Sequence, residues 1–364
     1  DNKFNIEKSS MGGGKILDRI RSDSLFVYKN ADDVSINHSR IIEVVRSLTD
    51  EEISKFSHST VQDTCDLDFS AGSPIGDYKG MTHAIRRHIN FLATIDLINF
   101  ASGFRNELHK SNSKGAYQTI HEGVVRFFKI ENHVSAEIFR SISLEKIATL
   151  FEISLEQESL KQLATMLLEV IQSTGEILLK EGKKDLAEFV WDNTSITSGE
   201  TKPIASSLVQ SLVDTFPSFR DIHEFKDKTI YIVKKAQLLC ADLHRHFGET
   251  IPSHFGFSDL QSLTIMSDNV IPAVLRKFGI LVISKELQTR IDAAEILPPG
   301  NQEVELRSIS IYACELITKE IKKHFAAREN FTDMNLDFYL WCKGKDPEFR
   351  AVERHYTQDT IFYQ

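Results

Sequence analysis

The stretch that decides the fold runs from His88 to Phe104 and reads His-Ile-Asn-Phe-Leu-Ala-Thr-Ile-Asp-Leu-Ile-Asn-Phe-Ala-Ser-Gly-Phe. It is strongly apolar, which predicts a buried helix, and Ala101-Ser-Gly103 interrupts it. Outward from this stretch, apolar residues recur at helical spacing on both sides. The spacing predicts helices over Ser35–Arg46, Leu144–Leu155 and Glu156–Leu179.

Further helical segments follow the same spacing towards the C-terminus. They are predicted at residues 185–192, 203–216, 268–278 with a cap at Gly279, 284–294, 303–325 and from 336 onward. Strand signals are short and scattered, and residues 62–82 have the composition of a long loop. We therefore predict an all-α fold with few short strands. We expect a flexible N-terminal lead-in over residues 1–17 and one continuous domain over residues 18–364.

Composition limits the classes of function. The chain has 364 residues, 41% of them hydrophobic and 26% charged, with a formal net charge of -9, which is typical of a globular protein. Proteins that bind nucleic-acid polymers usually present a basic face, so the acidic balance argues against such a partner. A single phosphate group needs only a local cluster of cations.

The cysteines and the hydropathy pattern argue against three other classes. Cys65, Cys240, Cys314 and Cys342 are far apart and form no C-x-x-C pair, which argues against a zinc ribbon or a thioredoxin motif. The sequence shows no secretory signal and no apolar stretch of membrane-spanning length. These features predict a cytoplasmic enzyme with reduced thiols and no membrane partner.

Two segments carry polar groups within apolar surroundings. Asp96 and Asn99 lie three positions apart and share a helix face, which indicates either a structural network or one wall of a pocket. Lys234 and Lys235 are adjacent on a largely apolar helix and should not both point into a core. We expect one in solvent and one in a salt bridge, or at least one of them bound to a phosphate.

Acidic residues near aromatic ones gather in the C-terminal half of the sequence. Asp259, in Phe257-Ser-Asp259, and Asp268 are suited to helix N-caps or to a ligand site. Asp337 is surrounded in sequence by large apolar residues, and burial there would raise its pKa. Carboxylates, aromatic faces and cations together favour a pocket for a nucleotide-like ligand. For Glu303 and Glu305 we favour a structural role, with Arg307 among the candidate partners.

Taken in order, these segments resemble the queuosine-salvage family of queuosine 5′-phosphate N-glycosylases from about residue 18 onward. The blocks that carry the resemblance are Asp96-Leu-Ile-Asn99-Phe100, Phe216-Pro-Ser-Phe219-Arg220-Asp221, Lys234-Lys235-Ala-Gln237, Phe257-Ser-Asp259, Leu263-Thr264 with Asp268 and Pro272-Ala-Val-Leu275, Gly279, Gln302-Glu303-Val-Glu305-Leu-Arg307, Leu336-Asp337-Phe-Tyr339-Leu-Trp341 and Arg354-His355 with Phe362-Tyr363. The resemblance implies a helical domain related to helix-hairpin-helix DNA glycosylases. It also implies hydrolysis of queuosine 5′-monophosphate to queuine and ribose 5-phosphate, so that queuine returns to tRNA.

The resemblance also implies roles for single residues. Asp337 is expected at the ribose C1′ and Asp268, or Asp259, on the side of the base, although these two roles are interchangeable at this stage. The residues expected to bind substrate are Phe257, Asp259, Tyr339, Lys234, Lys235 and His58. No cofactor or metal is implied, the expected partner is the small nucleotide alone, and the oligomeric state is left open. The alternatives are a nucleosidase for another modified nucleotide and a queuine-binding protein without activity.

Overall fold

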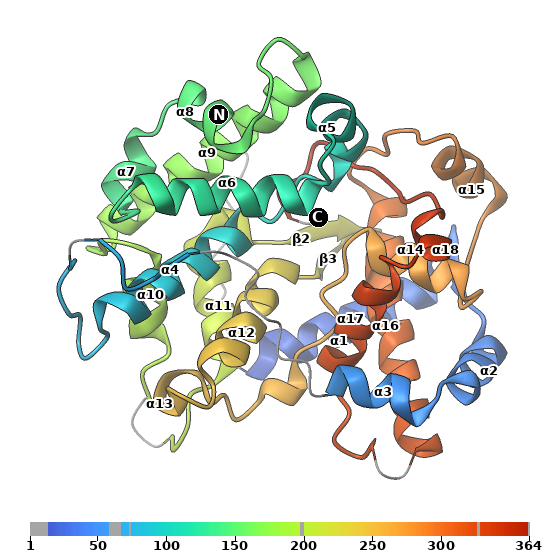
Figure 1. Cartoon of the computed structure of the whole chain (residues 1–364). Coiled ribbons are helices and arrows are strands. Elements are labelled where there is room, and N and C mark those ends of the chain that lie inside the picture. The colour runs from blue at the N-terminus through green and yellow to red at the C-terminus, as the bar shows by residue number, and fades with distance from the viewer. Residues whose placement is uncertain (1–13, 58–66, 73, 197–199, 326–327, 363–364) are drawn as a thin grey trace.

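The computed structural model describes residues 14–57, 67–72, 74–196, 200–325 and 328–362, and most of these residues are helical (Figure 1). The helices are α1 (Gly14–Asn30), α2 (His38–Ser47), α3 (Asp50–Ser57), α4 (His83–Leu97), α5 (Arg105–Asn112), α6 (Ala116–Ile130), α7 (Ala136–Ser141), α8 (Leu144–Phe151), α9 (Glu158–Lys180), α10 (Leu186–Asn193), α11 (Ala205–Thr215), α12 (Lys234–Phe247), α13 (Pro252–Phe255), α14 (Val270–Lys277), α15 (Lys285–Asp292), α16 (Asn301–His324), α17 (Asp333–Lys343) and α18 (Pro347–Arg350). Short 3₁₀ turns are η1 (Ser102–Phe104), η2 (Pro217–Phe219) and η3 (Leu260–Ser262). The predicted all-α class is confirmed.

The strands form two small antiparallel pairs within the described residues. β1 (Val34–Ile36) pairs with β4 (Leu281–Ile283), and β2 (Ile222–Phe225) pairs with β3 (Lys228–Tyr231). The second pair leads directly into α12. No described helix has both the length and the apolar character needed to cross a bilayer.

Local sequence explains where several helices start and stop. The side chains of Ser143, Asp185 and Ser284 each accept a hydrogen bond from a first-turn N–H, which fixes the starts of α8, α10 and α15. The predicted cap of α14 is confirmed, because Gly279 has φ +73° and the N–H of Ile280 reaches back to the carbonyl of Leu275.

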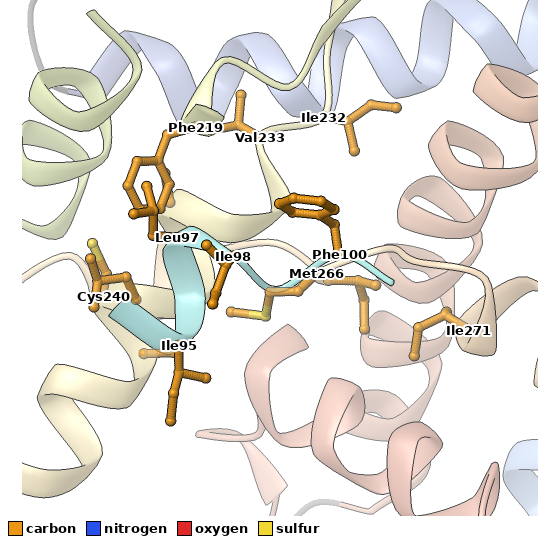
Figure 2. Close-up of a cluster of buried hydrophobic side chains, with 14 of the residues drawn as sticks. Ile95, Leu97, Ile98, Phe100, Phe219, Ile232, Val233, Cys240, Met266 and Ile271 are labelled. Carbon is orange, nitrogen blue, oxygen red and sulfur yellow. The ribbon is translucent and has the colours of Figure 1, made fainter. Parts of the chain in front are cut away.

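The apolar stretch around Asp96 forms the buried centre of the molecule. α4 ends at Leu97, and Figure 2 shows Leu97 and Ile98 close to Phe219 and Val233. Phe100 continues this cluster towards Met266 and Ile271. The end of α4, the start of α12 and the segment before α14 are therefore held together by burial of apolar surface, which is the main favourable term in folding.

The interruption at Gly103 has a specific packing role. A Cβ atom on Gly103 would lie 2.2 Å from the carbonyl oxygen of Thr357, so only glycine admits the C-terminal segment this close. The side chain of Gln358 donates to the Gly103 carbonyl at 3.1 Å. This contact brings the chain just after Arg354 against the turn that precedes Arg105.

The N-terminal helix joins the rest of the fold through α16. α1 packs along α16 (Figure 1), and Glu305 on α16 accepts hydrogen bonds from the N–H groups of Asp32, Asp33 and Val34. The structural role favoured for Glu305 is therefore confirmed. α1 begins at Gly14, within the predicted lead-in, and residues 1–13 lie outside the described residues. The single domain over residues 18–364 stays a prediction.

Candidate active site

A cavity of about 430 Å³ lies where α4, α6, α12, α14 and α17 meet. The charged, aromatic and imidazole side chains of its lining fall into three chemical groups. The acidic group is Asp96, Asp242, Asp268 and Asp337; the cationic group is Arg105, Lys234, Arg245, Lys345, Arg350 and Arg354; the aromatic and imidazole group is Phe91, Tyr117, His121, His246, Phe338 and Trp341. A cavity of this size suits a small ligand with a few placed polar groups.

Lys234 forms part of the buried floor of this cavity. It lies in the first turn of α12, and its Nζ donates to Oδ1 of Asn99 at 3.2 Å. Burial lowers the pKa of Lys234, and the neighbouring carboxyl groups of Asp268, Asp96 and Asp337 partly oppose that shift. An ammonium group has three donors, and Asn99 takes one of them.

Asp268 is held at the N-terminus of α14. Its Oδ1 accepts from the N–H groups of Val270 at 2.7 Å and Ile271 at 3.1 Å, the first two residues of the helix, although Asn269 holds the N-cap position. The side chain is nearly buried and borders the cavity. The positive end of the helix dipole favours negative charge at this place.

Asp337 enters the cavity from α17. A capping box between Thr332 and Asn335 fixes the start of that helix, and the N–H of Met266 donates to Oδ1 of Asp337 at 2.9 Å. Burial, together with the nearby charge of Asp268, raises the pKa of Asp337 to about 7. The predicted direction of this shift is confirmed. A carboxyl group with this pKa exchanges a proton near neutral pH, as an acid–base catalyst must.

Asp96 is the most deeply placed acid. Burial and the neighbouring Asp242 raise its pKa well above the ordinary value. Its Oδ2 lacks a hydrogen-bond partner among the described residues. Asp242 is paired with Arg245 on the same helix. Asp96 and Asn99 therefore form one wall of a cavity, which was one of the two alternatives that the sequence left open.

Another part of the lining is cationic and more exposed. Arg105 and Arg354 are half-buried and Arg350 is exposed. Burial lowers the pKa of Arg354, and the charges of Arg105 and Arg350 lower it further while Asp268 opposes them, so these guanidinium groups lie close together. Sequence analysis missed Arg105 and Arg350 as site residues, and Arg354 entered only as part of a family block. The only sequence signal for Arg105 was its position directly after the apolar stretch.

Trp341 closes one side of the cavity. The Nζ of Lys345 lies 3.2 Å from the centre of its ring, and Tyr117 meets it edge-on with ring centres 6.1 Å apart. Both contacts orient flat aromatic surface beside the cationic part of the lining.

The structure brings Asp268, Asp337 and Lys234 to one cavity, whereas the lining does not include Lys235, Asp259, Phe257 or Tyr339. Lys235 is fully buried outside the lining, and its Nζ donates to the carbonyl of Leu97 at 2.7 Å. Burial and the adjacent Lys234 lower its pKa strongly. The expectation that one of the two lysines lies in solvent is wrong, because the last turn of α4 supplies a carbonyl acceptor to Lys235.

Four further predicted residues lie away from the cavity lining or outside the described residues. Asp259 accepts from the N–H groups of Ala205 and Ser206 and so caps α11. Phe257 borders a separate surface hollow, Tyr339 lies on α17 outside the lining, and His58 lies outside the described residues. Their substrate-binding roles stay predictions. Within the described ranges, no group of three His, Cys, Asp or Glu residues is arranged to hold a metal ion.

Comparison with known proteins gives consistent matches. A family model described as "Queuosine salvage protein" matches residues 79–363. A Nematostella vectensis protein named "Queuosine 5'-phosphate N-glycosylase/hydrolase" is 26% identical over 302 residues, which cover 76% of this chain and 82% of the relative. Relatives of the same name are 31% identical over 243 residues in Mus musculus and 32% identical over 189 residues in Sphaerobacter thermophilus. These two matches cover 63% and 51% of this chain, and 66% and 56% of the relatives' lengths.

Proposed function

The chain belongs to the family of queuosine salvage proteins, and from this premise we propose that it hydrolyses the N-glycosidic bond of queuosine 5′-monophosphate. The products are queuine and ribose 5-phosphate. The names of the relatives support this reaction, because they describe action on a queuosine 5'-phosphate. The observation that carries the proposal is that one cavity holds an acidic floor with Lys234 and a cationic side with three arginines.

The arginine side supports recognition of the 5′-phosphate. Arg105, Arg350 and Arg354 gather where the lining is partly exposed. One guanidinium group can bind two phosphate oxygens through two parallel N–H donors. The alternative that the sequence suggested, a phosphate held by Lys234 or Lys235, has less support. Lys234 lies among carboxyl groups, and Lys235 is outside the lining.

The acidic floor supports the chemistry. Departure of the base leaves positive charge around C1′ of the ribose, and a carboxylate stabilises that charge. We assign this role to Asp268, which two backbone N–H groups hold at the N-terminus of α14. The roles of the two acids are then the reverse of those first expected from the sequence.

Asp337 and Lys234 act on the leaving base in this proposal. The pKa of Asp337, about 7, suits it to deliver a proton to the base as the bond to C1′ breaks. The free donors of Lys234 stabilise negative charge on the same group. Water then adds to C1′ and gives its proton to the Asp337 carboxylate left by the first step. This restores the acid and releases ribose 5-phosphate.

Asp96 and Asp242 support recognition of the base. Queuine carries a secondary amine in its cyclopentenediol arm, and this amine is cationic near neutral pH. Asp96 offers an unpartnered oxygen at the floor, and Asp242 lies next to it. Binding of a cation there would favour ionisation of Asp96.

The test is incubation of the protein with queuosine 5′-monophosphate while free queuine is followed by mass spectrometry. Release by the wild type and its loss in Asp337→Asn and Asp268→Asn are the expected results. Faster cleavage of a purine nucleotide would favour a different nucleosidase. Tight queuine binding without any product would indicate a binding protein instead.

The proposal includes a free nucleotide as the substrate and the cytoplasm as the place of action. The formal net charge of -9 supports a small substrate over a nucleic-acid polymer. Four cysteines without a C-x-x-C pair are compatible with a reducing compartment.

A further inference from the structure

A fully buried arginine lies behind the cavity and is bound to both segments that carry its chemistry. Arg307, on α16, does not belong to the cavity lining. Its Nη1 and Nη2 donate to the two carboxylate oxygens of Asp221 at 3.0 and 2.7 Å. Its Nε donates to the carbonyl of Ser267 at 3.0 Å. One planar side chain thus joins two separate parts of the chain.

The Asp221 end of this bridge holds the start of α12. Oδ2 of Asp221 accepts from the N–H of Lys234 at 3.0 Å, and the carbonyl of Asp221 accepts from the N–H groups of Ile232 and Val233 at 3.1 Å each. Val233 has φ +53°, a conformation that a β-branched residue rarely adopts. Surrounding contacts must impose this conformation, and Asp221 supplies three of them.

The Ser267 end of the bridge holds the segment that leads into α14. Ser267 directly precedes Asp268, and Asn269 donates to the carbonyl of His355, the neighbour of Arg354. The position of the Asp268 carboxyl group is therefore fixed from both sides by buried hydrogen bonds. Glu303 completes the network by accepting from Nη1 of Arg307 at 3.1 Å, as the sequence allowed.

Charge and burial give this bridge its rigidity. Asp221, Arg307 and Glu303 are all essentially inaccessible to water. Burial alone would raise the pKa of Asp221, but the Arg307 guanidinium and His223 hold it below its ordinary value, so the carboxylate stays ionised. Removing one partner of such a buried pair leaves an uncompensated charge.

We infer that Arg307 and Asp221 are positioning residues that set the place of Lys234 relative to Asp268 in the reaction. Neither residue touches the cavity. They act because the planar guanidinium group of Arg307 binds both Asp221 and the carbonyl of Ser267. These bonds fix the N-terminus of α12 relative to the residue before Asp268. This inference rests on the proposed function, since the reaction supplies its kinetic readout.

The first test is Arg307→Lys. Lysine keeps the positive charge but lacks the planar guanidinium group that donates to Asp221 and Ser267 at the same time. We expect kcat to fall roughly 10- to 100-fold, because small misplacements of reacting groups have effects of this size. KM should stay within about twofold, because the residues assigned to phosphate binding are untouched. Asp221→Asn should act in the same direction and serves as the second variant if Arg307→Lys does not fold.

Arg86→Lys is the matched control. Arg86 is also a buried arginine that binds two carboxylates, Asp185 at 2.7 Å and Glu188 at 2.5 Å, but it lies near the start of α4. Thermal unfolding should show destabilisation of both variants, and kcat should fall only in Arg307→Lys. Equal kcat values for the two variants would overturn the inference.

A double-variant cycle separates positioning from general damage. In a Lys234→Met background, Arg307→Lys should lower kcat much less than it does in the wild type, since both changes affect the same group. Full additivity would contradict a role through Lys234.

Crystal structures of Arg307→Lys and Arg86→Lys give a readout that does not depend on turnover. Displacement of the Lys234 and Asp268 side chains in Arg307→Lys alone is expected, and unchanged positions would overturn the inference. If the wild type releases no queuine, the proposed function fails while these structures still decide whether Arg307 sets the two side chains.

Discussion

Nζ of Lys234 lies 3.2 Å from Oδ1 of Asn99, so the first residue of α12 is joined to the segment just after α4. This bond directs one lysine of an adjacent pair into the cavity, while Lys235 turns towards the carbonyl of Leu97. The two lysines are neighbours in sequence but differ in what they can reach. That difference makes them a natural pair of probes for the site.

Lys234→Met is expected to lower kcat roughly 10²- to 10³-fold, the range found when one preorganised donor is removed from an active site. Lys234 is buried, and methionine has a similar volume without the charge, so the exchange should preserve the packing. Lys235→Met should retain KM within about twofold, because Lys235 lies outside the cavity lining. Steady-state kinetics of queuine release measures both. A larger loss of kcat in Lys235→Met than in Lys234→Met would contradict the placement of the two side chains.

Activity should depend on the ionisation of Asp337. If Asp337 delivers a proton to the base, kcat is high below its pKa of about 7 and falls as the pH rises through that value. Asp337→Asn should be slow at every pH and lack this limb of the profile. The measurement is kcat between pH 5 and pH 9 for both proteins. A wild-type rate that rises through pH 7 would return Asp337 to the C1′ role.

The same group predicts a change in stability with pH. The pKa of Asp337 is higher in the folded protein than its ordinary value of 3.8, so the folded state holds this proton after the unfolded state has lost it. The contribution of Asp337 to the free energy of unfolding therefore decreases from about pH 4 to about pH 7. Asp337→Asn should lose this part of the slope in chemical denaturation. If the free energy of unfolding of the variant has the same pH dependence as that of the wild type, the raised pKa belongs to another group.

The assignment of phosphate recognition to Arg105, Arg350 and Arg354 can be tested through the packing of Gly103. Alanine there would meet the Thr357 carbonyl and displace the segment that follows Arg354. We expect Gly103→Ala and Arg354→Gln to raise KM for queuosine 5′-monophosphate by about tenfold or more, as loss of a charged hydrogen bond predicts. Unphosphorylated queuosine is the control substrate. Its kcat/KM should change much less, and an equal loss for both substrates would argue against phosphate recognition at this end.

Recognition of the queuine arm should depend on Asp96. Asp96→Asn keeps the volume of the side chain but removes the negative charge that would pair with the amine. We expect queuine affinity to fall about tenfold, while 7-deazaguanine, which lacks the arm, should bind equally to both proteins. Calorimetric titration with the two bases measures the difference. An equal loss for both bases would show that Asp96 does not distinguish the arm.

Local signals in the sequence predicted most of the helices because each start or stop depends on a few neighbouring residues. Gly279 shows this, since its left-handed conformation ends α14 within the chain itself. The sequence placed Lys234, Asp268 and Asp337 in one site through their resemblance to family segments. Their spacing along the chain did not predict a common cavity. Two features escaped because they depend on residues distant in sequence. Lys235 is buried where the distant Leu97 offers a carbonyl acceptor.

The other feature that escaped is the arginine cluster. Arg105 and Arg354 belong to two segments that meet where Gly103 lacks a side chain and Thr357 passes. No property of either segment alone predicts that contact. The sequence could therefore indicate a cation for the phosphate, but it indicated Lys234 or Lys235 where the structure gathers arginines.

The contact between Gly103 and Thr357 also has a consequence during synthesis of the protein. The cavity lining spans positions 91 to 354, so the ribosome must produce more than two hundred residues after the central helix before the cavity can close. At roughly 5 to 20 residues per second this takes on the order of tens of seconds. For that time the nascent chain lacks the final cover of α4, a helix whose residues are mostly buried in the folded protein. The supply of chaperones that shield such segments on the ribosome should therefore limit the yield of active protein.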